Sequence, residues 1–155
     1  MTRINCGIPV EALTDEHLLA EHREIKRLPD SFIKALDSGA LGRIPPEFCL
    51  GPGHVTFFLN KQRYIFLRYV KIYGECLKRG FNVESYHENW TRLQSAFERY
   101  DCWCSYWPRF AEFDLVKHRI EERIKNSPKA SWHYYGKAIT KDEAINLLNK
   151  SKHYE

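Results

Sequence analysis

A long stretch of helical periodicity is the feature that most constrains the fold. Between about residue 55 and residue 79 the apolar side chains recur at helical spacing, and Gly80 follows where such a helix would end. The expected buried side of this helix carries Phe58, Ile65, Val70 (or Tyr69), Tyr73 and Leu77. No segment shows the convincing apolar–polar alternation that is typical of a half-buried strand. The sequence therefore predicts an all-α fold.

A shorter helical pattern lies near the N-terminus. Thr14 can cap a helix in which Leu18, His22 and Ile25 face inward, and Pro29 is expected to stop or kink it. The pattern can resume over residues 31–37, with Gly39 at its end and with Phe32, Ile33 and Leu36 facing inward.

A last main helix is expected from Pro108 to Asn126. Its apolar stripe is Phe113, Val116, Ile120 and Ile124. Thr140 and Glu143 have the spacing of a capping box, which predicts a short C-terminal helix. Glycines and prolines make residues 40–53 a loop, and residues 82–107 are interpreted as short helical turns and loop.

These patterns predict one compact domain over residues 1–155. It would contain about three main helices with the N-terminal segment threaded between them, and residues 140–155 would form an extra tail. A chain of 155 residues with 43% hydrophobic residues is sufficient for one core.

Composition also limits the function classes. The net charge of +4 permits a polyanionic partner without proving one. The longest apolar runs are far too short to span a bilayer, and the N-terminus lacks the pattern of a signal peptide, so we expect a cytoplasmic protein. Five cysteines argue against a disulfide framework, and the spacing of Cys102 and Cys104 is too tight for the usual structural zinc site.

The second residue, Thr2, is small, which favours removal of Met1. The exposed α-amine would have an ordinary pKa of about 7.7–8.0. Nearby Arg3, Arg23 and Arg27 would lower that pKa, because like charges disfavour the ammonium form. A neutral amine is a nucleophile that can form a Schiff base at a sugar C1′.

Glu24 lies beside Arg23 and three residues before Arg27, in what the pattern predicts to be one helix. A carboxylate held ionised among cations could stabilise positive charge on a sugar and move protons. On spacing alone, the same three residues are more often a solvated helix face.

Several ordered strings carry a resemblance to a known family. They are residues 1–5 (Met-Thr-Arg-Ile-Asn), 14–24 (Thr-Asp-Glu-His-Leu-Leu-Ala-Glu-His-Arg-Glu) with Arg27, 51–58 (Gly-Pro-Gly-His-Val-Thr-Phe-Phe), 75–82 (Glu-Cys-Leu-Lys-Arg-Gly-Phe-Asn), 119–124 and 132–139. Together they resemble the phage-type pyrimidine-dimer DNA glycosylases, also called endonuclease V of the UV-repair kind. His54 is interpreted as a helix-entry or core histidine rather than a catalyst.

The resemblance implies a bifunctional enzyme, a DNA glycosylase and AP lyase. The Thr2 amine would displace the 5′ base of a cis-syn cyclobutane pyrimidine dimer, and β-elimination from the Schiff base would cut the strand. Glu24 would stabilise the cationic sugar. The implied DNA-binding residues are Arg3, Arg23, Arg27, Lys34, Arg119 and Arg123. The partner would be double-stranded DNA with pyrimidine dimers or abasic sites, the protein a monomer, and no metal or organic cofactor would be needed.

Alternatives remain open on the sequence. The chain could be a non-catalytic helical DNA-binding module, a metal-dependent nuclease, or a glycosylase/lyase whose lesion specificity has drifted. The aromatic residues 132–135 could stack on bases or pack onto the core. Glu16 stands where the best-known member has a glutamine thought to meet DNA, and a carboxylate there would repel phosphate.

Overall fold

A computed structural model describes residues 4–153, and these residues are mostly helical. The first half holds the 3-10 helices η1 (Val10–Ala12) and η2 (Ala40–Arg43) and the helices α1 (Asp15–Ile25), α2 (Arg27–Ser38), α3 (His54–Phe57) and α4 (Gln62–Lys78). The second half holds α5 (His87–Thr91), α6 (Gln94–Arg99), α7 (Phe110–Asn126), β1 (Ser131–Tyr134), β2 (Lys137–Thr140) and α8 (Lys141–Lys150). The all-α expectation fits approximately, but the expected count of about three main helices is not confirmed.

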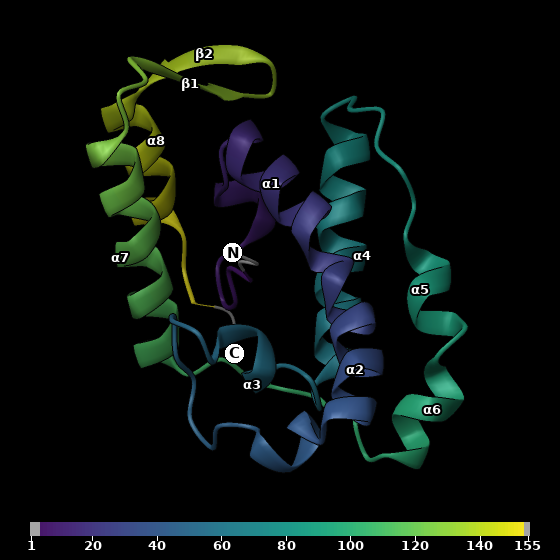
Figure 1. Cartoon of the computed structure of the whole chain (residues 1–155). Coiled ribbons are helices and arrows are strands. Elements are labelled where there is room, and N and C mark those ends of the chain that lie inside the picture. Colours follow the sequence, from purple (N-terminus) through teal and green to yellow (C-terminus); the bar gives the residue numbers. More distant parts are fainter. Residues whose placement is uncertain (1–3, 154–155) are drawn as a thin grey trace.

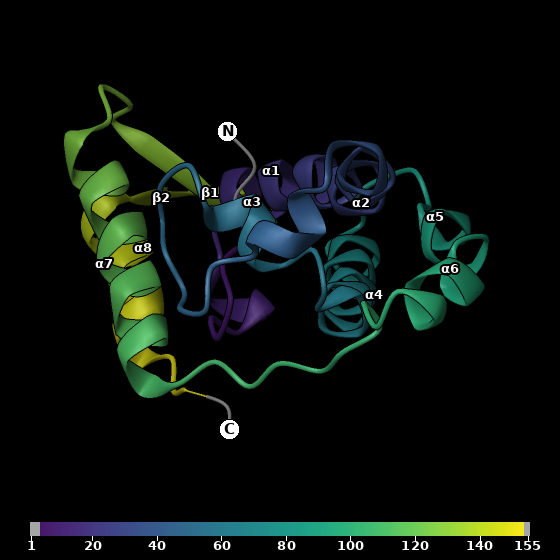
Figure 2. The ribbon, with the colours of Figure 1, turned by 60° about the horizontal axis from the view of Figure 1, so that its bottom comes forward.

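The helices form two groups with the N-terminal segment between them (Figure 1). On one side α7 packs on α8, and on the other α4 packs on α1 and α2, with α5 and α6 beyond α4 (Figures 1 and 2). The side chains of Ile4, Cys6 and Ile8 are fully buried between these groups. The beginning of the described chain therefore belongs to the core.

The first helical region divides before Pro29. α1 ends at Ile25 and α2 begins at Arg27, so Arg27 opens the second helix and does not lie in the first. Pro29 occupies the first turn of α2, where its missing N–H breaks no intrahelical hydrogen bond. The expected inward residues Leu18, His22 and Ile25 are buried.

The long helix expected over residues 55–79 is two helices, which corrects the prediction. The helix is interrupted between Phe57 and Gln62, where Lys61 forms an isolated antiparallel bridge with Trp103. The Gln62 N–H donates to the Cys102 carbonyl, and the Cys104 N–H donates to the Asn60 carbonyl. Helical periodicity in the sequence gives no sign of this long-range pairing.

The buried side of α4 agrees with the prediction in part. Ile65 and Tyr69 are buried as expected, and Ile72 and Cys76 are buried as well, whereas Val70 and Leu77 are 45% and 51% exposed. Because α4 starts only at Gln62, its inward stripe is set by its own packing on α1 and not by continuation from Phe58. In α2, Phe32 is buried as expected, but Ile33 is exposed.

The C-terminal segment contains a β-hairpin, so the prediction that the fold has no strand was wrong. β1 pairs antiparallel with β2 from Ser131–Thr140 to Tyr134–Lys137. Tyr135 and Gly136 both have positive φ, which is the backbone that a two-residue hairpin turn needs. Only Trp132 is buried in the two strands, so no apolar alternation was visible in the sequence.

The last helix is integrated into the fold. The Thr140–Glu143 capping box is present, and Ala144 and Leu148 of α8 are buried. The stripe predicted for α7 is buried as well: Phe113, Val116, Ile120 and Ile124. Residues 141–150 therefore form the predicted short C-terminal helix and contribute to the core. No helix within residues 4–153 combines the length and the apolar character required to cross a membrane.

Candidate active site

One face of α1 lines a small pocket beside the N-terminal segment. His17, Ala20, Glu21 and Glu24 occupy this face at helical spacing. Thr14 fixes the start of the helix, because its hydroxyl accepts a hydrogen bond from the His17 backbone N–H at 3.3 Å. The His17 ring nitrogen Nδ1 lies 2.8 Å from the same hydroxyl oxygen. A single well-capped helix thus presents an imidazole and two carboxylates to the same pocket.

A buried ion pair holds the N-terminal segment against this face. The Glu21 carboxylate accepts from the Asn5 backbone N–H at 3.0 Å and from the Asn5 side-chain amide at 2.8 Å. Arg68 of α4 donates to both oxygens of the same carboxylate, at 3.0 Å each. The two ionic side chains are almost fully buried, and their fork-to-fork geometry satisfies both charges.

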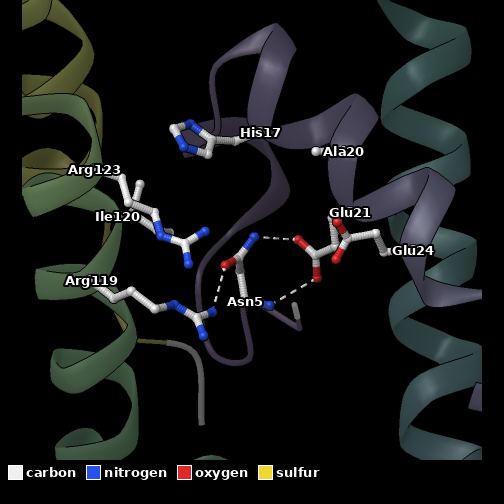
Figure 3. Close-up of a pocket in the computed structure, with 8 residues that line it drawn as sticks. All are labelled: Asn5, His17, Ala20, Glu21, Glu24, Arg119, Ile120 and Arg123. Carbon is white, nitrogen blue, oxygen red and sulfur yellow. Dashed lines mark hydrogen bonds between the residues drawn. The ribbon is translucent and has the colours of Figure 1, made fainter. Parts of the chain in front are cut away.

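The opposite wall comes from α7. Arg119, Ile120 and Arg123 line the pocket, and the Arg119 guanidinium donates to the Asn5 side-chain oxygen at 3.1 Å. Figure 3 shows Arg119 and Arg123 extending from α7 towards the N-terminal segment, with Glu21 and Glu24 on the far side. Asn5 therefore bridges an acidic wall and a basic wall.

Glu24 is the pocket carboxylate whose hydrogen bonding is incomplete among the described residues. Its Oε2 atom is buried and has no hydrogen-bond partner among residues 4–153. Figure 3 shows the Glu24 side chain pointing into the same space as that of Glu21. A buried acceptor without a partner is costly, so such an atom often marks a place where chemistry or binding occurs.

A second contact fixes the segment one residue earlier. The Ile4 backbone N–H donates to His54 Nε2 at 3.0 Å, and His54 Nδ1 lies 2.9 Å from the Cys49 carbonyl oxygen. Burial lowers the pKa of His54 below its ordinary value. His54 is thus a neutral core histidine, as the sequence suggested. Burial also raises the pKa of the neighbouring Cys6 thiol to about 12, so this cysteine is a poor nucleophile.

The expected site residues are only partly brought together. Glu24, Arg119 and Arg123 line the same pocket. Arg23, Arg27 and Lys34 are exposed on α1 and α2 and are not among the lining residues. Thr2 and Arg3 lie outside the described residues. Among the described residues, the cations that line the pocket with Glu24 are therefore Arg119 and Arg123 of α7, and not its neighbours in sequence.

The hairpin closes the pocket region from one side. Trp132 is buried and stacks on the His17 ring, with the ring centroids 5.0 Å apart. Glu16 accepts from the His133 backbone N–H at 3.1 Å and lies 2.8 Å from His133 Nδ1. Although partial burial opposes it, these hydrogen bonds keep the pKa of Glu16 below its ordinary value. Glu16 therefore anchors the hairpin, and Trp132 packs as a core residue.

Several lining residues were not among the expected site residues. They are Asn5, His17, Ala20, Glu21 and Ile120. The helical spacing of His17, Glu21 and Glu24 on α1 was available as a signal for three of the four lining residues of that helix. The position of Asn5 had no such signal, because its partners are 16 and 114 residues away.

The fold and the pocket define a class: a small helical protein in which a buried carboxylate oxygen and two arginines line one pocket beside the N-terminal segment. The family model for pyrimidine dimer DNA glycosylases matches residues 1–89, which is more than half of the chain. The chain belongs to this family of DNA repair glycosylases, whose substrate is DNA. The matched region includes α1 and the Asn5–Glu21–Arg68 network, and α7 with its two arginines lies beyond it. Within residues 4–153, no group of three or more His, Cys, Asp or Glu side chains is placed to hold a metal ion.

Proposed function

We propose that the protein is a DNA glycosylase with AP lyase activity that excises cis-syn cyclobutane pyrimidine dimers from duplex DNA. The nucleophile is the N-terminal α-amine of Thr2 after removal of Met1. The observation that carries the proposal is the buried Glu24 oxygen without a described partner, in a pocket that also holds two arginines of α7.

The composition of the pocket supports an N-terminal nucleophile. Its lining offers carboxylates, an imidazole and guanidinium groups, but no lysine, cysteine or serine among the described residues. The α-amine of Thr2 is separated from Ile4 by two residues, so it can lie no further than about 7 Å from the Ile4 nitrogen. That nitrogen is held in the core by His54.

The chemistry proceeds in two stages. In the first, the amine nitrogen bonds to C1′ of the 5′ nucleotide while the bond from C1′ to the pyrimidine breaks, and the sugar ring opens to a protonated Schiff base. In the second, a C2′ proton is removed, the C3′–O bond breaks, and hydrolysis of the imine frees the enzyme. Glu24 stabilises the cationic sugar and moves protons during ring opening and elimination.

The arginines bind the DNA backbone electrostatically. Arg119 and Arg123 are one helical turn apart on α7 and can contact neighbouring phosphates. We expect Arg3, Arg23, Arg27 and Lys34 to contribute further phosphate contacts. Extrusion of a base at the lesion costs a few kcal/mol, least at a damaged site, which favours dimers over intact DNA. We expect the enzyme to act as a monomer.

The test is borohydride trapping on three duplexes: one with a defined thymine dimer, one with an abasic site and one undamaged. The proposal predicts covalent adducts with the first two only, and full activity in EDTA. An adduct with the abasic duplex alone would mean a lyase of drifted lesion specificity. The absence of any adduct would favour a non-catalytic DNA-binding module, and loss of activity in EDTA would favour a metal-dependent nuclease.

A further inference from the structure

The contact between Ile4 and His54 assigns a definite tautomer to the imidazole. Nε2 faces a backbone N–H, which can only donate, so Nε2 must be the unprotonated acceptor. Nδ1 faces the Cys49 carbonyl, which can only accept, so Nδ1 carries the proton. The His54 side chain therefore links the N-terminal segment, through Nε2, to the loop before α3, through Nδ1.

The surroundings of His54 keep it neutral and rigid. The side chain is 1% exposed, and the rings of Phe48 and Phe58 pack edge-on against it at 5.5 and 5.3 Å. The charged groups that act on it are Arg119 of α7 and Glu21 of α1, and these have opposite signs. Burial is the largest influence, and it disfavours the imidazolium.

Ile4 is the first described residue, and it lies two residues after Thr2. Its next neighbour, Asn5, is held by Glu21, which stands one helical turn before Glu24 on α1. The path from the Ile4 nitrogen to the Thr2 amine is about 7 Å at full extension. A displacement of Ile4 by one ångström therefore moves the whole region that the amine can occupy relative to Glu24.

We propose that His54 is a positioning residue. By accepting a hydrogen bond from the Ile4 amide through Nε2, it fixes the position of the N-terminal amine relative to Glu24. This inference rests on the proposed function, since it assumes that the amine reacts. His54 touches no reacting atom. Its effect is exerted through the backbone of residues 2–4, and misplacement of a reacting group by about 1 Å can cost roughly 100-fold in rate.

Two substitutions separate the two contacts of the imidazole. In His54→Gln the side-chain oxygen extends to about the position of Nε2 and can accept from the Ile4 amide. In His54→Asn the shorter amide can donate to the Cys49 carbonyl, as Nδ1 does, but cannot reach Ile4. Both variants place an uncharged amide in the same buried site, so each serves as the matched control of the other.

The experiment measures single-turnover formation of the borohydride-trapped adduct on an abasic duplex, beside DNA affinity by fluorescence anisotropy. We expect His54→Asn to slow adduct formation by about 10- to 100-fold with DNA affinity within about twofold of wild type, and His54→Gln to stay within about fivefold of the wild-type rate. Equal rates in the two variants, whether both normal or both slow, would overturn the inference.

A second readout keeps this test separate from that of the proposed function. Hydrogen exchange of the Ile4 amide should be slow in wild type and His54→Gln and faster in His54→Asn. If wild-type protein forms no adduct, the proposed function fails, and the positioning role of His54 fails with it. The exchange data would then show only whether His54 holds the segment. If wild-type protein forms the adduct and His54→Asn does so equally fast, only the positioning inference fails.

Discussion

The Glu24 side chain ends in a pocket that holds a second carboxylate, that of Glu21. The Glu21 carboxylate accepts hydrogen bonds from Asn5 and Arg68. We therefore expect Glu24→Gln to remove the acid–base and electrostatic contribution without disturbing the segment that Glu21 holds. Loss of a positioned general acid or base costs about 100- to 10,000-fold in rate. The expected outcome is a decrease of that size in dimer excision, measured by single-turnover cleavage, with DNA affinity unchanged.

The matched control for Glu24→Gln is Glu88→Gln. Glu88 is an exposed carboxylate on α5, which lies beyond α4 from the pocket (Figure 1). This substitution changes the charge by the same amount and should leave excision unaffected. Wild-type rates in Glu24→Gln would contradict the assigned role of this carboxylate.

Two buried histidines give the stability a defined pH dependence. Burial lowers the pKa of both His22 and His54 below their ordinary value of about 6.5. Between that value and the lowered ones, the unfolded chain binds more protons than the folded chain. Stability that is fully present above about pH 6.5 is therefore lost as the pH falls through the folded-state pKa values.

The measurement is the urea midpoint between pH 7.5 and pH 5.5, which should fall as the pH falls. Glu16 and Glu112 have lowered pKa values as well, but their contribution is lost only below about pH 4.5, outside this range. The double variant His22→Gln, His54→Gln should show a flatter profile than wild type. A midpoint that rises towards pH 5.5 in wild type would refute the expectation.

At the scale of elements, two acids at the start of α1 hold the hairpin: Glu16 contacts β1, and the buried Asp15 holds the turn. The Asp15 carboxylate accepts from Arg79 at 2.8 Å and from the backbone N–H groups of Tyr135 and Gly136 at 3.1 and 2.8 Å. Arg79 retains Glu75 as a second partner. We expect Asp15→Ala to lower the free energy of unfolding by about 3 kcal/mol, because it breaks a buried ion pair and leaves the N–H groups of the hairpin turn without their acceptor.

Chemical denaturation checks this prediction. Asp37→Ala, at an exposed position of α2, is the control and should change the free energy of unfolding by less than about 0.5 kcal/mol. Equal stabilities of the two variants would show that the hairpin is held by other contacts, such as the stacking of Trp132 on His17.

The elements that could be predicted are those whose signals are local. The Thr14 cap, the apolar stripe of α7 and the Thr140–Glu143 capping box each depend on residues within a few turns of one another. The break before Gln62 could not be predicted, because it is made by pairing with residues about 40 positions away. The hairpin was missed because its one buried side chain, Trp132, gives no alternation.

The same distinction holds for the site. Arg119, Arg123 and Glu24 were expected from ordered strings in the sequence, and they do share a pocket. Asn5 and Glu21 were not expected, because their importance comes from Arg68, which is 47 residues from Glu21 and buried with it. Polar groups buried far from their partners in sequence are the part of a site that local patterns cannot reveal.

At the scale of the whole molecule, the charge distribution predicts how DNA binding responds to salt. The net charge is +4, and two of the positive groups, Arg119 and Arg123, line the pocket wall. Each phosphate contact releases about one counterion, so the affinity should fall steeply with salt. Arg123→Ala should reduce the slope of log Kd against log salt concentration by about 1.

The control for that measurement is Arg92→Ala, at an exposed position at the end of α5, beyond α4 from the pocket (Figure 1). It removes the same charge and should leave the slope within error of wild type. The same slope for the two variants would mean that net charge, and not the wall of the pocket, governs DNA binding.

The identity of the nucleophile is the central claim, and mapping the covalent adduct tests it most directly. Wild-type protein would be trapped with borohydride on an abasic duplex, digested with protease and nuclease, and the modified peptide sequenced by mass spectrometry. Our account predicts a single modification on the α-amine of Thr2, in protein that has lost Met1. A modification on a lysine side chain such as that of Lys61, or an adduct from protein that retains Met1, would contradict it.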